Sequence, residues 1–403
     1  MAREERVVVV GAGVVGVATA WSLARRGLSV TLIDGCEGPG LGTSFANGGQ
    51  LSYSYTDALA SPGLLKKLPW LAAGRDSAFR VSKRLDPHFL RWGVAFLGNC
   101  TAERFTRNTL VGLRLGLASR LALHELLERH PLDFGHQTAG KLLLHEDATT
   151  FRAAAALADR KNAHGAEQAV IGPAEAMVIE PALGSIASRL VGAIWAPGEE
   201  VGDPHLFANA LTAVLVRDYG VLTHFGARAE RLQQGAEVRV RLESGEWLVA
   251  DQLVLCPGPQ SNTLLRRAGF RIPIMPVRGH SFTAPLGPEA PRVSLTDISR
   301  KLVFCQLSGR MRVAGQADVG VHRAAVDGAR LRSLVTAAKE SLPNAADYGA
   351  ITSSWAGLRP VTPNSLPVVE RRGRVTVNVG HGALGWTYAL ATAEQAAALV
   401  TGA

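Results

Sequence analysis

Apolar runs and glycine turns alternate over the first 34 residues in a pattern typical of a β-α-β unit. Residues 6–10 consist of Arg6 and four valines, the kind of continuous run that a buried parallel strand needs. An apolar helix over 14–24 follows, and a second apolar run over 28–33 ends at Asp34. The pattern therefore predicts a buried strand, a helix packed on it, and a second strand beside the first.

The turn between the first strand and the helix carries the spacing Gly-x-Gly-x-x-Gly. Gly11 permits a tight turn, Gly13 lets the backbone approach a pyrophosphate, and Gly16 lets the helix pack close to the strand. The helix N-terminus faces the phosphate charge, and Asp34 is placed to accept hydrogen bonds from a ribose diol. The motif indicates a dinucleotide site, the alternative being an ordinary glycine turn. By itself it does not separate NAD from FAD, although its start near the N-terminus favours a flavoprotein.

A loop rich in glycine and small hydroxyl residues follows over 38–50. Its many backbone N–H groups suit the wrapping of a pyrophosphate. A flexible surface loop is the alternative interpretation. Because the loop comes directly after the second strand of the nucleotide motif, we expect it to contact the cofactor.

The middle of the chain alternates between helical and strand patterns. Helical spacing of leucines or alanines predicts helices over 101–130, 151–165, 173–180, 206–219 and 331–342. The fourth of these begins with Asp203 as N-cap and Pro204 at its first position. Short apolar runs predict strands over 141–145, 190–195, 221–225, 237–242, 247–249 and 250–258, the last closing the sheet of the first motif.

Strands broken by proline and glycine follow over 272–317, which predicts an antiparallel sheet in a separate layer. Near the end of the chain, a strand over 374–379, a glycine turn over 380–387 and an alanine-rich helix repeat the geometry of the opening motif. We therefore expect both ends of the chain to meet at one cofactor.

Composition limits the class of protein. A chain of 403 residues exceeds one typical core, so two domains are expected, and 47% hydrophobic residues suffice for globular cores. The net charge of +9 is spread along the chain. It indicates either an ordinary solvated surface or an affinity for an anionic surface or an acidic substrate. Nothing in the sequence resembles a nucleic-acid-binding module.

The four cysteines lie far apart without metal-ligand spacing, which favours reduced thiols, a cytosolic protein and no metal site. No apolar stretch is long enough to span a bilayer. The stretches 64–71 and 88–97 mix apolar and basic residues and are candidates for a membrane interface. Helices packed on the domain core are the alternative.

Several motifs together point to a family. With the opening glycines, the segments 43–50, 202–207, 357–363 and 380–387 resemble the FAD-dependent D-amino-acid oxidase superfamily, and within it the bacterial D-amino-acid dehydrogenases. The resemblance implies an α/β (overall α+β) protein with a Rossmann-like FAD-binding domain and a substrate domain with a mainly antiparallel sheet. The expected FAD-binding segments are 1–85, 150–185, 200–265 and 350–403. The expected substrate-binding segments are 86–149, 186–199 and 266–349.

The resemblance also implies an activity, the oxidative deamination of D-amino acids to 2-oxo acids and ammonia by hydride transfer from Cα to flavin N5. Electrons would pass to a membrane quinone, with the protein in the cytoplasm or peripheral on the cytoplasmic face of the inner membrane. The alternatives are a related enzyme acting on glycine, sarcosine or hydroxyproline, a flavin-binding subunit without activity, and an NAD-dependent dehydrogenase. The turn over 380–387 speaks against the last.

Site roles follow where motifs match. Arg359 lies in the motif whose arginine grips the substrate carboxylate, and its guanidinium suits a bidentate contact. Tyr55 matches a tyrosine near the substrate entrance, and Tyr53 is a weaker candidate. His381 is expected to line the active site, a structural role being equally open. His280 stands where the superfamily usually has an aromatic hydroxyl, which bears on substrate preference.

The resemblance assigns the cofactor to residues from five parts of the chain. They are Gly11, Gly13, Val14, Val15, Gly16, Asp34, Gly42, Thr43, Ser44, Asn47, Gly48, Gly49, Gln50, Leu51, Arg228, Ala229, Pro257, Gly258, Gly382, Ala383, Leu384, Gly385, Trp386 and Thr387. Asp34 stands where the superfamily more commonly has Glu, and Asn364 where it has Asp. The sequence shows no convincing His–Asp pair, serine triad or metal cluster, which fits a reaction catalysed mainly by positioning.

Overall fold

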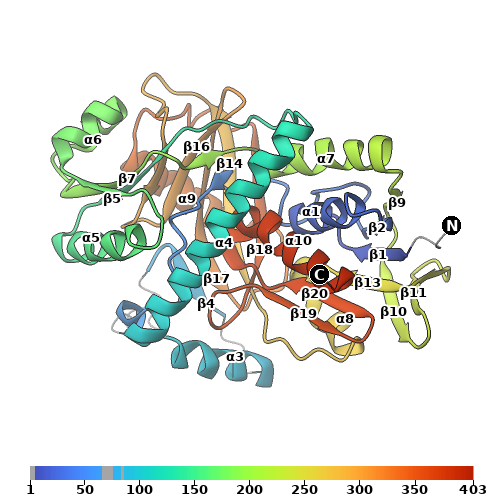
Figure 1. Ribbon diagram of the computed structural model, residues 1–403. Helices are drawn as coiled ribbons and strands as arrows, with labels where there is room; N and C mark the ends of the chain where they lie inside the picture. Colours follow the sequence, from blue (N-terminus) through green and yellow to red (C-terminus); the bar gives the residue numbers. More distant parts are fainter. Residues whose placement is uncertain (1–4, 66–75, 83–85, 403) are drawn as a thin grey trace.

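A six-stranded sheet holds both ends of the chain. The computed structural model describes residues 5–65, 76–82 and 86–402. The strand order is β19-β20-β13-β1-β2-β9 (Figure 1). All neighbours are parallel except β19 and β20. The strands are β1 (Arg6–Val10), β2 (Ser29–Ile33), β9 (Leu222–His224), β13 (Gln252–Leu255), β19 (Val368–Arg372) and β20 (Val375–Val379).

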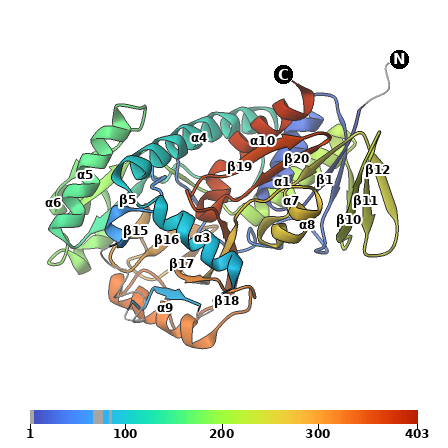
Figure 2. The ribbon, with the colours of Figure 1, turned by 90° about the horizontal axis from the view of Figure 1, so that it is seen from below.

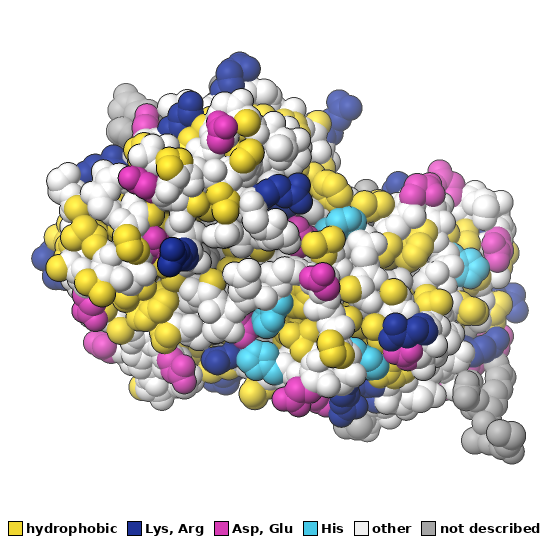
Figure 3. Space-filling view, turned by 90° about the horizontal axis from the view of Figure 1, so that it is seen from above, with side chains coloured by type: hydrophobic (Ala, Val, Ile, Leu, Met, Phe, Trp, Pro, Cys, Tyr) yellow, Lys and Arg dark blue, Asp and Glu magenta, His cyan; other side chains and the backbone are white. Residues whose placement is uncertain are grey.

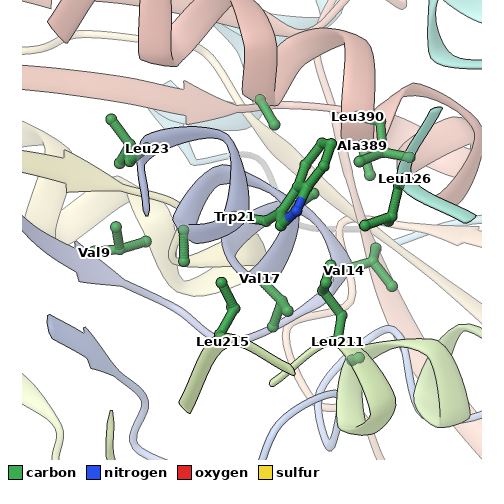
Figure 4. Close-up of a cluster of buried hydrophobic side chains, with 14 of the residues drawn as sticks. Val9, Val14, Val17, Trp21, Leu23, Leu126, Leu211, Leu215, Ala389 and Leu390 are labelled. Atoms are coloured by element: carbon green, nitrogen blue, oxygen red, sulfur yellow. The ribbon is translucent and has the colours of Figure 1, made fainter. Parts of the chain in front are cut away.

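The valines of β1 are buried on both faces of this sheet. Val7 and Val9 contact the layer formed by α1 (Val14–Ala24), α7 (Pro204–Tyr219) and α10 (Gly385–Thr401). Trp21 of α1 lies fully buried in this layer, beside Leu126 and Leu390 (Figure 4). Val8 and Val10 point to the opposite face. That face is covered by α8 (Ser261–Arg267) and a three-stranded sheet of β10 (Ala229–Gln234), β11 (Val238–Leu242) and β12 (Trp247–Ala250).

The second large sheet has nine strands in the order β18-β14-β17-β16-β15-β5-β7-β6, with β4 paired to β17. Its pairs are antiparallel except β15–β5 and β4–β17, so the expected mainly antiparallel sheet is confirmed. The strands are β4 (Phe79–Val81), β5 (Lys141–His145), β6 (Ala169–Ile171), β7 (Gly192–Ala196), β14 (Met275–Pro285), β15 (Ser294–Asp297), β16 (Leu302–Leu307), β17 (Arg310–Val319) and β18 (Ser353–Val361).

Helices surround this second sheet and connect it to the first. Helix α9 (Gly328–Ser341) lies against the sheet (Figure 2). Its Leu334 and Ala338 are buried in the core on that side. The long helix α4 runs across the molecule and packs on α10. The remaining elements are α3 (Pro87–Gly98), α4 (Ala102–Arg129), α5 (Ala148–Asn162), α6 (Pro173–Ile179), α9 (Gly328–Ser341), the short strands β3 (Gln50–Leu51) and β8 (Glu200–Val201), and the 3₁₀ turns η1 (Pro181–Ile186), η2 (Gly258–Gln260) and η3 (Gly382–Leu384).

Most predicted elements are confirmed, with shifts that local chemistry explains. Helix α5 begins at Ala148 rather than at residue 151 because the Asp147 carboxylate accepts a hydrogen bond from the Thr150 N–H. The strands predicted over 237–242 and 247–249 form a separate small sheet. The strand predicted over 250–258 corresponds to β13, which joins the six-stranded sheet beside β1. The strands β4, β6 and β18 belong to the nine-stranded sheet, although the expected FAD-binding segments include them. The domain boundaries stay a prediction.

The surface and the cysteines agree with the composition. Basic and acidic side chains are interspersed on the face shown in Figure 3, and all four cysteines are unpaired. Within the described ranges, no helix is long and apolar enough to cross a membrane. Two stretches were considered for a membrane interface, and residues 66–71 of the first stretch, 64–71, lie outside the described residues. The other forms α3, in which Trp92 and Phe96 are buried in the core.

The close approach of α1 to β1 supplies a test. A Cβ on Gly16 would overlap the Gly11 carbonyl oxygen, so we expect Gly16→Ala to lower the free energy of unfolding by about 1–3 kcal/mol or more. Gly93, inside α3, is the matched control because a Cβ there meets nothing within 4 Å. Gly93→Ala should be neutral or stabilising by up to about 1 kcal/mol. Urea unfolding measures both, and a Gly16→Ala protein as stable as the wild type would refute this packing.

Candidate functional site

One large cavity lies between the two sheets. Its volume is about 1500 Å³, and its wall includes the ends of β1 and β2, the loop after β2, the turn over 378–386, and parts of β14, β17 and β18. Ordinary small-molecule pockets measure roughly 300–1,000 Å³. The cavity is therefore large enough for an extended cofactor together with a small substrate.

The N-terminus of α1 forms one end of the cavity. Gly13 is the N-cap, no side chain caps the helix there, and its first turn holds no acidic residue. The Ser44 hydroxyl accepts a hydrogen bond from the Val14 N–H at 3.2 Å. Asp34 is fixed at the end of β2 because its carboxylate accepts hydrogen bonds from the N–H groups of Ala12 and Cys36, at 2.6 and 2.8 Å. A positive helix end beside a fixed carboxylate suits a pyrophosphate and a ribose.

The N-terminus of α10 opens on the same cavity. It too has no side-chain cap and no acidic residue in its first turn, and residues 382–386 line the wall. The loop after β2 runs between the two helix ends and is tied to β18, since the Thr43 hydroxyl donates to the Leu358 carbonyl at 2.8 Å. As expected from the sequence, segments from both ends of the chain meet at one site.

The structure brings most of the predicted cofactor residues to this wall, namely Gly11, Gly13, Val14, Val15, Asp34, Gly42, Thr43, Ser44, Asn47, Gly48, Gly49, Gln50, Arg228, Ala229, Pro257, Gly258, Gly382, Ala383, Leu384, Gly385 and Trp386. Three others do not line the cavity. Gly16 packs on Gly11, Leu51 lies in the core, and the Thr387 hydroxyl accepts a hydrogen bond from the Ser52 N–H. These three support the wall from behind.

Arg359 lies in a slot made by two irregularities of the nine-stranded sheet. The guanidinium crosses β14 at Gly279, where a Cβ would overlap it. Two residues of β17, Gln316 and Ala317, stand opposite Gly279, which makes a β-bulge. Gln316 has φ of 67°, and its carbonyl accepts a hydrogen bond from Arg359 Nη1 at 2.7 Å. The bulge and the missing side chain together hold the guanidinium at the cavity wall.

The charge of Arg359 has no carboxylate in contact with it among the described residues. Burial lowers the pKa of Arg359, and the more distant Asp318 acts in the opposite direction. Asp318 forms ion pairs with Arg278 at 2.9 Å and Arg330 at 2.7 Å. An arginine stays protonated in proteins, so Arg359 presents a half-buried cation to whatever occupies the cavity.

His280 also lines the cavity, on β14 next to Gly279. Its Nε2 accepts a hydrogen bond from the Asp327 N–H at 3.3 Å. Burial lowers the pKa of His280 to about 4, and the neighbouring Arg278 adds to this. The ring is therefore neutral at pH 7 with its proton assigned to Nδ1. Its Nδ1 is buried and has no hydrogen-bond partner among the described residues.

The other three candidates differ in their placement. Tyr55 lines the cavity. Tyr53 does not, since it is buried behind the wall and its hydroxyl donates to the Glu200 carboxylate at 2.7 Å. His381 reaches the wall, but its Nε2 shares a hydrogen bond of 2.9 Å with the Thr392 hydroxyl, and burial lowers its pKa to about 3. The geometry favours a structural role for Tyr53 and His381.

Sequence reasoning missed Lys141, Gln316 and Gly279, all of which line the cavity. It also missed Arg312, whose guanidinium donates to the Asn47 carbonyl at 3.1 Å and to the Thr283 hydroxyl at 2.7 Å. The sequence could have indicated Lys141, because a lysine that begins a short strand with three leucines is buried only if it has a partner. The positive φ of Gln316 left no trace in the sequence.

The sequence model of the family described as FAD dependent oxidoreductase matches residues 6–399 of the chain. The protein is a member of this family. The cavity fits the family's cofactor, since the N-termini of two helices without an acidic residue in the first turn and the Asp34 carboxylate face it.

Curated relatives of this FAD-dependent oxidoreductase are similar over nearly the whole chain. One is the D-amino acid dehydrogenase 2 of Ralstonia nicotianae, 39% identical over 98% of this chain and 96% of its own. Another is the D-amino acid dehydrogenase of Paramagnetospirillum magneticum, 39% identical over 98% of this chain and 95% of its own.

Solved structures share the fold at low identity. The L-proline dehydrogenase from P. horikoshii has a TM-score of 0.77 at 20% identity, covering 100% of this chain and 94% of that one. The glycine oxidase from Geobacillus kaustophilus has a TM-score of 0.74 at 22% identity, covering 98% and 95%. The mixed α/β fold with its two large sheets is therefore that of this family.

Proposed function

We propose that the protein is an FAD-dependent dehydrogenase that oxidatively deaminates D-amino acids to 2-oxo acids and ammonia. The observation that carries the proposal is Arg359, a half-buried cation held on the wall of a flavin-sized cavity. Curated relatives at 39% identity bear the name D-amino acid dehydrogenase, which supports the substrate class.

The cofactor supplies the acceptor for a hydride from the substrate Cα, and the chain supplies positioning. We assign the pyrophosphate to the N-terminus of α1, where Gly13, Val14 and Val15 line the cavity. We assign the flavin to the turn over 382–386, because the positive end of α10 favours negative charge on a reduced flavin.

The substrate is held by its carboxylate. Arg359 has N–H groups beyond its one bond to Gln316, and a carboxylate matches a guanidinium in shape and charge. We assign to the neutral ring of His280, which lines the same wall, a packing contact with the substrate. Fixing these groups brings Cα to the cofactor in one orientation, so positioning supplies most of the rate enhancement. The imino acid product is hydrolysed by water after release.

The purified holoprotein should show a flavin absorption spectrum, and D-amino acids should bleach it under anaerobic conditions. The panel includes D-alanine, D-proline, acidic D-amino acids, their L-isomers, glycine and sarcosine. We expect reduction by D-isomers at rates well above those of L-isomers, because a single orientation of Cα faces the flavin. Bleaching by L-isomers alone would refute the stereochemistry, and bleaching by none would refute the amine substrate.

Arg359→Met should lower kcat/KM for any D-amino acid by about 10–150-fold, mainly through KM, because a charge-assisted contact to the carboxylate is lost. Arg310→Met is the matched control, since Arg310 is an exposed arginine at the start of β17. Stopped-flow flavin reduction measures both variants. Unchanged kinetics in Arg359→Met would remove Arg359 from the substrate site.

We further propose that a membrane quinone reoxidises the flavin and that the protein rests on the cytoplasmic face of the membrane. The exposed residues Leu90, Val94 and Leu97 support this, since their spacing places them on one face of α3. A ubiquinone analogue should reoxidise the flavin faster than oxygen does.

The wild-type protein should sediment with vesicles that contain anionic lipid. Val94→Glu should weaken this binding because it places a negative charge in the apolar face of α3. Val170→Glu is the control, being an exposed valine in β6, away from α3. Equal binding of both variants would exclude α3 as the contact, and faster reoxidation by oxygen would exclude the quinone.

A further inference from the structure

A lysine that the proposed reaction does not use lines the cavity. Lys141 begins β5 and is 2% exposed. Its Nζ donates hydrogen bonds to Gln50 Oε1 at 2.8 Å and Ser52 Oγ at 2.7 Å. It also lies 4.6 Å from the centre of the Tyr55 ring. All four side chains belong to residues of the cavity wall, so Lys141 is a built part of the site.

The order of the strands gives the separation of Lys141 from Arg359. The Arg359 guanidinium reaches β17, where it bonds the Gln316 carbonyl. The strands β16, β15 and β5 follow β17 in order. Gln50, which holds Lys141, also donates to Ser294 and Leu295 on β15. Across the strands, the two cations are two to three spacings apart, about 10–14 Å. The register also shifts them by about two to four residues along the strands, since Gly315 lies level with Leu144 and Lys141 lies level with Ser294. The separation is therefore about 12–18 Å.

The charged residues that the strands of the nine-stranded sheet and their hairpin turns contribute to the wall are basic, namely Lys141, Lys301 and Arg359. Lys301 has a partner, Asp76. The acidic residues of the wall come from elsewhere, from β2 (Asp34), from the residue before α3 (Asp86) and from the small sheet (Glu230 and Glu243).

The protein compensates the positive charge of Lys141 only in part. Burial lowers the pKa of its ammonium group to about 8, while Glu199 acts in the opposite direction. Glu199 is buried and does not line the cavity, and one of its carboxylate oxygens is held by the Ser54 hydroxyl at 2.5 Å. A buried cation that is hydrogen-bonded to neutral groups gains most from an anion supplied by a ligand.

We propose that Lys141 is a second anion-binding residue and that it receives the side-chain carboxylate of an acidic D-amino acid held at Arg359. This inference rests on the proposed function and narrows its substrate class. The lengths overlap for the longer acid, since four or five carbons place the carboxyl carbons about 4–5 Å apart. A charge-assisted hydrogen bond and a C–O bond add about 3–4 Å at each end. The total is about 10–13 Å.

The wild-type enzyme already tests this proposal. Glutamine and asparagine have nearly the shape of glutamate and aspartate without the charge. We expect kcat/KM for D-glutamate or D-aspartate to exceed that for the matching D-amide by about tenfold or more, the effect of one charged hydrogen bond. Equal values for acid and amide would overturn the proposal.

Variants assign the preference to Lys141. Lys141→Met should reduce the acid-to-amide ratio to within about twofold to threefold, and Lys141→Arg should restore most of it. Lys161→Met is the matched control, since Lys161 is a buried lysine that bonds Ser54 and Asp57 and does not line the cavity. It should keep the wild-type ratio. If Lys141→Met slowed the enzyme equally for acids and amides, Lys141 would only hold Gln50 and Ser52 in place, and the proposal would be wrong.

Binding gives a readout that needs no turnover. Glutarate and pentanoate each have five carbons, with two carboxylates and one respectively. We expect glutarate to perturb the flavin spectrum of the holoprotein at a concentration at least about tenfold lower than pentanoate, and this difference should vanish in Lys141→Met. Equal affinities in the wild type would refute the subsite even if D-amino acids reduce the flavin. Tight glutarate binding without any flavin reduction would leave the subsite standing and refute the proposed function.

Discussion

The packing of α1 against α10 is the contact on which the site depends. The fully buried Trp21 lies against Ala389 and Leu390 in one core (Figure 4). Beside it, the Glu394 carboxylate accepts a hydrogen bond from the Ser22 hydroxyl at 2.6 Å and pairs with Arg25 at 2.8 Å. These contacts join helices from opposite ends of the chain. They fix the distance between two helix N-termini that face the same cavity, and so between the two halves of one cofactor.

A second set of contacts holds the loop after β2 against the nine-stranded sheet. The Arg312 guanidinium bonds the Asn47 carbonyl. The Ser281 hydroxyl bonds the Ala46 carbonyl at 2.6 Å, and Gln50 bonds β15. Most of these bonds engage backbone carbonyls of the loop, so they fix its path and leave the cavity side open. The nine-stranded sheet is thereby held against this loop.

Local sequence patterns were enough to predict many of the elements and most of the residues that line one end of the cavity. The valines of β1, the three glycines and Asp34 act through neighbours a few residues away, or through the parallel strand beside them. The antiparallel sheet over 272–317 was predicted for the same reason, since its strands are separated by short turns. The residues at 380–386 were found because they repeat a local motif.

The substrate end could not be predicted in the same way because long-range packing decides it. Arg359 was found by its motif, but the slot that holds it needs Gly279 and the bulge at Gln316, which are brought together by strand pairing. The sequence ranked Tyr53 below Tyr55 and left a structural role equally open for His381, but it could not show where the side chains of Tyr53 and His381 point. In the fold their polar atoms contact Glu200 and Thr392 instead of the cavity.

The most direct measurement is a crystal structure of the holoprotein with a 2-oxo acid product bound. The account predicts the pyrophosphate of FAD at the N-terminus of α1 and the α-carboxylate of the product about 3 Å from the Arg359 guanidinium nitrogens. It also predicts that Arg359 keeps its bond to the Gln316 carbonyl. A carboxylate bound elsewhere, with the Arg359 guanidinium out of contact with the ligand, would contradict the central claim.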